Sequence, residues 1–95
     1  MSPINKKKLY LLRTKLDKLD NKLLEIIKKR SNLVKEVLKL KVYKKEIIDK
    51  KRINFILKKI RKKSIQKRID PKITSRIWKN MIWSFINFEK RNFKK

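Results

Sequence analysis

The chain has 95 residues, enough for one small domain, and carries 32 Lys or Arg against eight Asp or Glu, a formal net charge of +24. It contains no cysteine and no histidine, which excludes a disulfide scaffold, argues against a zinc site and removes the usual general base. No segment has the unbroken apolar length of a membrane span, and residues 1–6 lack a signal peptide's apolar centre. We therefore expect a soluble, cytoplasmic protein that uses no metal or cofactor.

The positive charge has two interpretations. One is a protein that binds nucleic acid or an anionic membrane. The other is compositional: Lys, Ile and Asn are abundant while Ala and Gly are absent, a pattern expected from an A/T-rich genome. Because the lysines are spread along the whole chain, the charge by itself names no partner.

Helical periodicity dominates the first part of the chain and predicts a helix over about residues 6–41. Its apolar stripe comprises Leu9, Leu12, Leu16, Leu19, Leu23, Ile27, Val34 and Val37. Arg30 and Lys41 lie on this stripe, and their separation of about three turns places them within roughly 20° of each other, about 16 Å apart. A buried cation is costly unless an anion meets it, so with few acids available the anion is expected to be a ligand. The alternative is that both side chains reach from the edge of a core to water.

Two shorter helices are predicted in the rest of the chain. Residues 42–48 break the period and predict a loop, and Asp49 is the expected N-cap of a helix over residues 49–64 with apolar residues Ile53, Ile56, Leu57 and Ile60. Asp70-Pro71 predicts the start of a helix over residues 70–90, followed by a basic tail over 91–95. The face that this last helix turns to the core is expected to carry Ile73, Ile77, Met81, Phe85 and Phe88. The predicted fold class is all-α, with three helices in a single domain over residues 1–95.

The length of the first helix predicts an oligomer. A helix over residues 6–41 spans roughly 54 Å, whereas a compact globule of this size is only about 30 Å across. Its apolar stripe therefore needs a partner chain, most simply in an intertwined homodimer. The alternative is a broken helix that folds back, but no breaker occurs in residues 9–41. Arg13 lies about 100° around the helix from Arg30, so in an antiparallel dimer it could reach the partner's pocket.

A set of short motifs follows a fixed order along residues 9–90. They are Leu12-Arg13, Leu16-Asp17, Leu19-Asp20, Leu23-Leu24, Lys29-Arg30, Leu33, Val37, Lys41, Asp49-Lys50-Lys51-Arg52, Asp70-Pro71, Arg76-Ile77-Trp78 and Ile86-Asn87-Phe88-Glu89. This ordered set resembles the all-helical class of chorismate mutases. The resemblance implies a stand-alone, monofunctional enzyme, an intertwined homodimer with two active sites that rearranges chorismate to prephenate on the route to phenylalanine and tyrosine. A pericyclic rearrangement fits a pocket without histidine or cysteine, because it needs a held dicarboxylate and donors at the ether oxygen.

The resemblance also implies roles for individual residues. Arg30 would hold one substrate carboxylate, and Arg13 from the other chain would hold the second. Lys41 would donate to the ether oxygen and a nearby carboxylate. The remaining residues that would line the site are Val37, Asp49, Arg52 and Phe85, the last at a position that is often polar in the family and is interpreted here as packing.

Two positions depart from the family pattern. Ile53 stands where the family commonly has a Glu that accepts the substrate hydroxyl. Glu89 stands where many members have a Gln that donates to the ether oxygen. We hypothesise that Glu89 acts in its protonated form, so that activity falls as pH rises; the alternative is a solvated or salt-bridged residue near the helix end.

Two other functions are compatible with the sequence. An isochorismate pyruvate lyase of the same fold needs the same cationic grip on its substrate. A basic helical dimer could instead bind nucleic acid, with Trp78, Trp83 and Phe93 as possible stacking groups. Binding driven by phosphate contacts would weaken steeply with salt, which separates the nucleic-acid alternative from the enzyme.

Overall fold

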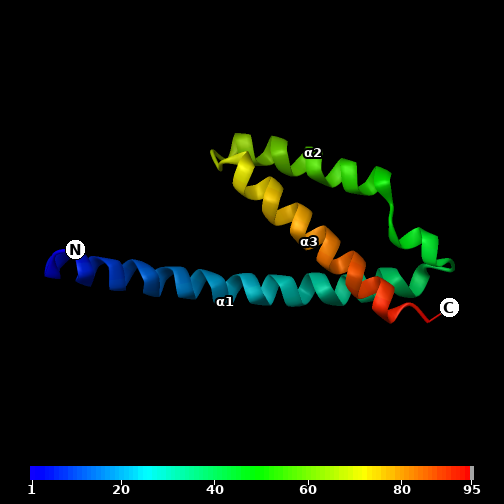
Figure 1. Cartoon of the computed structure of the whole chain (residues 1–95), viewed down its shortest axis with the longest axis horizontal. Helices are drawn as coiled ribbons and strands as arrows, with labels where there is room; N and C mark the ends of the chain where they lie inside the picture. The colour runs from blue at the N-terminus through cyan, green and yellow to red at the C-terminus, as the bar shows by residue number, and fades with distance from the viewer. Residues whose placement is uncertain (95) are drawn as a thin grey trace. The chain divides into compact units, whose positions relative to one another are not determined.

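The computed structural model describes residues 1–94, which form three α-helices and one short 3-10 helix, with no strand among them. In chain order these are α1 (Pro3–Leu40), η1 (Lys44–Ile47), α2 (Lys50–Gln66) and α3 (Pro71–Asn92) (Figure 1). The predicted all-α class with three helices is confirmed. Within the described residues, no helix has both the length and the apolar character needed to cross a membrane.

The ends of the helices differ from the predicted ranges by one to three residues. α1 begins at Pro3 because Ser2 caps it: the Ser2 hydroxyl accepts from the Asn5 amide at 3.1 Å, and proline suits the first helical position. α2 starts at Lys50 and α3 at Pro71, each preceded by the aspartate that the sequence predicts as its cap. Of the predicted basic tail, residues 91 and 92 belong to α3, and residue 95 lies outside the described part of the chain.

The end of α1 corrects one prediction that bears on function. The helix stops at Leu40, so Lys41 is the first residue beyond it and not its last member. The Lys41 amide donates to the Leu38 carbonyl at 3.1 Å, three residues back, which tightens the final turn. The backbone at Lys41 is therefore held by α1 on one side and by the following turn on the other.

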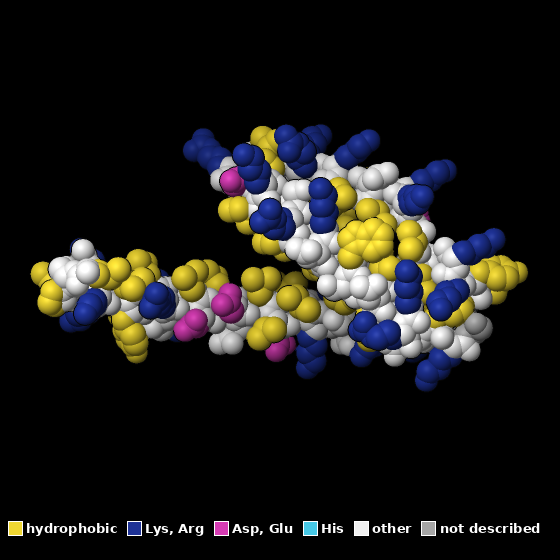
Figure 2. Space-filling model, in the orientation of Figure 1, with side chains coloured by type: hydrophobic (Ala, Val, Ile, Leu, Met, Phe, Trp, Pro, Cys, Tyr) yellow, Lys and Arg dark blue, Asp and Glu magenta, His cyan; other side chains and the backbone are white. Residues whose placement is uncertain are grey.

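The contacts divide the chain into two compact units, and the first comprises Met1–Leu33. This unit is a single stretch of α1 with no fully buried residue. Its apolar side chains other than the half-buried Leu9 are exposed in the single chain, as Figure 2 shows along the N-terminal half of the helix. Leu12, Leu16, Leu19 and Leu23 are each between 53% and 57% exposed.

The second unit begins at Val34 and contains the small core of the chain. α2 and α3 lie side by side and run in opposite directions (Figure 1). The buried apolar side chains within residues 1–94 are Ile47 of η1 and Ile82 and Ile86 of α3. Partly buried residues pack around them from the end of α1, from the segment before α2, from α2 and from the C-terminus, namely Leu38, Ile48, Ile53, Ile56, Leu57 and Phe93.

The predicted core face of α3 is only partly correct. Ile73 and Ile77 are 56% and 51% exposed, although the periodicity placed them toward the core. The buried positions of α3 are Thr74, Ile82, Ile86 and Glu89. Two of the four are polar, so an apolar stripe cannot reveal this face.

In the connection between α2 and α3, an arginine adopts the left-handed backbone conformation that glycine usually adopts at the end of a helix. Arg68 adopts the left-handed conformation with φ of 59°, and its amide donates to the Ile65 carbonyl at 3.1 Å. The Ile69 amide donates to the Ser64 carbonyl at 2.9 Å, which completes a Schellman motif at the end of α2. A pair of buried hydroxyls joins the two helices nearby, with Ser64 Oγ 2.7 Å from Thr74 Oγ1.

Candidate active site

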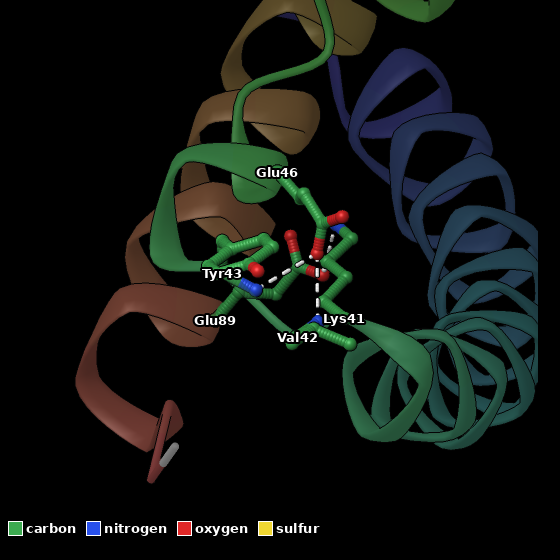
Figure 3. Close-up of polar contacts among 5 residues, drawn as sticks. All are labelled: Lys41, Val42, Tyr43, Glu46 and Glu89. Carbon is green, nitrogen blue, oxygen red and sulfur yellow. Dashed lines mark hydrogen bonds and ion pairs between the residues drawn. The ribbon is translucent and has the colours of Figure 1, made fainter.

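The second unit brings Lys41 and Glu89 into direct contact. Lys41 follows α1, Glu89 lies in the last part of α3, and Lys41 Nζ donates to Glu89 Oε1 at 2.9 Å (Figure 3). The two side chains are only 18% and 7% exposed. Burying two opposite charges costs desolvation free energy that their attraction only partly offsets. The stability of the fold therefore gives no clear reason for burying this pair.

A second carboxylate organises the turn that carries Lys41. Glu46 Oε2 accepts from the backbone amides of Val42 and Tyr43 at 2.7 and 2.9 Å. The Glu46 amide donates in return to the Tyr43 carbonyl at 3.0 Å. The amides of Tyr43 and Val42, and then the positive charges of Lys41 and Lys45, lower the pKa of Glu46 below its usual value. Figure 3 shows Glu46, Lys41 and Glu89 grouped around this turn.

The sequence pattern does not predict Glu46 as a site residue, because residues 42–48 have no helical periodicity. One local signal exists in retrospect. A Glu three positions after the residue that precedes a helix is typical of a capping arrangement, in which its side chain returns to the backbone before the helix. Tyr43 precedes η1 in an extended conformation, and Glu46 stands at that third position.

Two predicted site residues lie at the start of α2. Asp49 caps the helix, since its Oδ1 accepts from the Arg52 amide at 3.0 Å. Both side chains are exposed in the single chain. The guanidinium carbon of Arg52 lies 5.6 Å from the centre of the Phe55 ring, within the range of a cation–π contact. No motif in the sequence indicates Phe55 as a site residue.

The other predicted site residues are distributed over both units. Arg13 and Arg30 belong to the first unit, where Arg13 is exposed and Arg30 is half-buried. In the second unit Val37 is 48% exposed, and Phe85 is half-buried. Ile53, at the position where the family commonly has Glu, packs against the core of Ile47, Ile82 and Ile86.

The fold and the site together define a class of protein. The chain is all-helical, it buries an ion pair between a lysine and a carboxylate, and it contains no histidine or cysteine. A comparison with protein families makes the class specific. The sequence model described as chorismate mutase type II matches residues 12–90, and the chain belongs to this family. It is a chorismate mutase, an isomerase that converts chorismate to prephenate in aromatic amino-acid biosynthesis. The searches of curated proteins and of solved structures returned no match.

Proposed function

We propose that Lys41 and Glu89 form the part of the chorismate mutase site that acts on the ether oxygen of the substrate. The observation that carries this proposal is the contact of 2.9 Å between Lys41 Nζ and Glu89 Oε1, with both side chains largely buried. A buried ion pair contributes little net stability. We therefore assign the pair a catalytic role, in which Glu89 holds the Lys41 ammonium in a fixed position next to the substrate.

The chemistry of the rearrangement matches such a group. The ether C–O bond breaks while a C–C bond forms within the same molecule, so no nucleophile or base takes part. The rate depends on a compact substrate conformation and on donors at the ether oxygen, where negative charge develops. An ammonium group has three N–H donors, so Lys41 can bond Glu89 and still donate to the ether oxygen and to a carboxylate.

Glu89 is proposed to act in its protonated form, as a second donor to the ether oxygen. A carboxyl group that carries its proton can donate to the ether oxygen, whereas a carboxylate can only accept. Glu89 Oε1 lies 2.9 Å from Lys41 Nζ, so both groups can reach the same substrate atom.

The two substrate carboxylates are assigned to arginines, whose planar guanidinium groups hold carboxylates in a bidentate manner. Arg30 would hold one carboxylate, and Arg13 of a second copy of the chain would hold the other. Support for a homodimer comes from the exposed apolar side chains of the first unit, because exposed apolar surface on this scale is typical of an interface.

The remaining residues of the proposed site line it. Asp49 and Arg52 would contribute from the start of α2, Val37 from α1 and Phe85 from α3. The exposure of Asp49, Arg52 and Val37 in the single chain is compatible with contacts to a ligand or to a second copy. A cytoplasmic location stays a prediction from the sequence.

The test is an assay with purified protein, in which chorismate is followed by its ultraviolet absorbance and the product is identified by chromatography. Prephenate formation is expected, and Arg30→Ala should abolish it. Arg61→Ala, which removes an exposed arginine of α2, is the matched control and should keep full activity. Full activity in Arg30→Ala would contradict the assigned role. Release of pyruvate from isochorismate, with no prephenate from chorismate, would identify the lyase alternative.

A further inference from the structure

We propose that Glu46 is a positioning residue for Lys41: its carboxylate fixes the turn after α1 and thereby aims the Lys41 ammonium into the active site. The inference rests on the catalytic role proposed for Lys41 and adds a residue that acts through it.

The first support is the pattern of hydrogen bonds. One oxygen of Glu46 accepts from the amides of Val42 and Tyr43, the two residues that directly follow Lys41. On the other side the Lys41 amide donates to the Leu38 carbonyl. The backbone is thus fixed immediately before and after Lys41, which restricts the directions that its side chain can take.

The second support is the anchoring of Glu46 itself. The next residue, Ile47, is only 3% exposed and packs in the core with Ile82 and Ile86 of α3. Ile86 precedes Glu89 by three residues, so both lie on the same side of α3. Glu46 therefore connects the backbone at Lys41 to the same part of α3 that carries its ion-pair partner.

The third support is the chemistry of the carboxylate. An ionised carboxylate that accepts backbone amides makes shorter and stronger hydrogen bonds than a neutral acceptor does. The distance from the Val42 amide to Glu46 Oε2 is 2.7 Å, which is short for such a bond. The turn is consequently held by a strong interaction in a segment that has no other regular structure before η1.

The expected effect is kinetic. The bond from Lys41 to the ether oxygen is needed in the transition state, so a misaimed lysine lowers kcat more than it raises KM. Misplacement of a catalytic group by about 1 Å can cost on the order of 100-fold in rate. We expect Glu46→Ala to lower kcat by about 10- to 100-fold while KM changes less than about threefold.

Three further variants make the test specific. Glu46→Gln keeps an oxygen that can accept both amides and should retain most of the activity. Glu46→Asp keeps the charge but shortens the side chain by one methylene, so its kcat should fall as that of Glu46→Ala does. If Glu46→Ala fails to fold, the kcat of Glu46→Asp tests the positioning role in its place. Glu36→Ala is the matched control, because the Glu36 side chain is 68% exposed on α1 and its ion pair within the described residues is with the exposed Lys39. The kcat and KM of Glu36→Ala should equal those of the unmodified enzyme.

A double-mutant cycle separates this inference from the proposed function. If Glu46 acts through Lys41, Glu46→Ala should cause no further loss in a Lys41→Ala background. Equal losses in both backgrounds would overturn the positioning role, as would normal kcat in Glu46→Asp. Full activity in Lys41→Ala alone would instead overturn the catalytic role of Lys41.

Discussion

The ammonium of Lys41 and the carboxylate of Glu89 meet at 2.9 Å although 48 positions separate them in the sequence. The pair joins the residue that follows α1 to the last turns of α3, and both side chains are largely buried. In a mutase whose reaction requires donors at one ether oxygen, this contact brings a permanent donor and a titratable group to the same place.

Loss of the Lys41 ammonium should lower kcat by about 100- to 1,000-fold if, as proposed, Lys41 donates to the ether oxygen in the transition state. Steady-state assays of Lys41→Ala with chorismate measure this effect. Helical circular dichroism of the variant should be retained, although its stability should decrease because Glu89 loses its cation. Lys39→Ala is the matched control, since the Lys39 side chain is 72% exposed, and it should behave as the unmodified enzyme does.

Replacing Glu89 with Gln tests whether Glu89 acts as the proposed donor to the ether oxygen. Glu89→Gln keeps an N–H donor at this position, so steady-state assays with chorismate should show activity close to that of the unmodified enzyme. A large loss of activity in Glu89→Gln would refute the donor role.

Acid should weaken the turn that Glu46 holds. The amides of Tyr43 and Val42 lower the pKa of Glu46 from its usual 4.5, so the folded state holds this proton less tightly than the unfolded state does. The stabilisation from Glu46 is therefore complete above pH 4.5 and is lost as pH falls through the lowered pKa. Urea unfolding at several acidic pH values should show a weaker pH dependence for Glu46→Gln than for the unmodified protein. Glu36→Gln, at an exposed site, should keep the steeper dependence.

Glycine at position 68 should stabilise the protein. Arg68 has φ of 59°, which costs a residue with a side chain roughly 1–2 kcal/mol relative to glycine. Arg68→Gly should raise the free energy of unfolding by roughly 0.5–1 kcal/mol, after the greater entropy of glycine in the unfolded chain is deducted. Lys67→Gly is the control, because φ there is −89° and the same change should destabilise. Denaturant unfolding of both variants measures the difference.

Mixed dimers test whether Arg13 acts across an interface. Arg13→Ala and Arg30→Ala chains should each be inactive alone. In a mixed dimer one site carries both substitutions and the other carries neither, so equal mixing with free exchange should restore about one quarter of full activity. If Arg13 acts within its own chain, mixing restores nothing.

How far the sequence predicts the fold is clearest at the helix starts. Asp70-Pro71 and Asp49 were identifiable because a capping side chain stands directly before a helical pattern, and the structure confirms both caps. Ser2-Pro3 has the same chemistry, but no apolar residue of the stripe lies near it, so the pattern does not predict this cap. The helix α1 ends one residue before the predicted end, because Lys41 continues the spacing of the stripe although its backbone does not continue the helix.

The site shows a similar limit. The sequence singled out Lys41 and Glu89 separately, one as a cation on an apolar stripe and the other through the family resemblance. Their contact depends on how the turn after α1 packs against α3, which a periodic pattern does not encode. The sequence does not predict the contacts of Glu46 for the same reason: its side chain accepts hydrogen bonds from backbone amides, and its position in a turn gives no apolar signal.

The exposed side chains of α1 have a consequence for how the enzyme behaves on dilution. No residue of Pro3–Leu40 is buried within the chain, and helices in water gain most of their stability from packing. If a second copy supplies that packing, mass action couples folding to association, and the melting temperature rises with protein concentration. Specific activity should then fall at low concentration together with helix content, since one equilibrium would govern both.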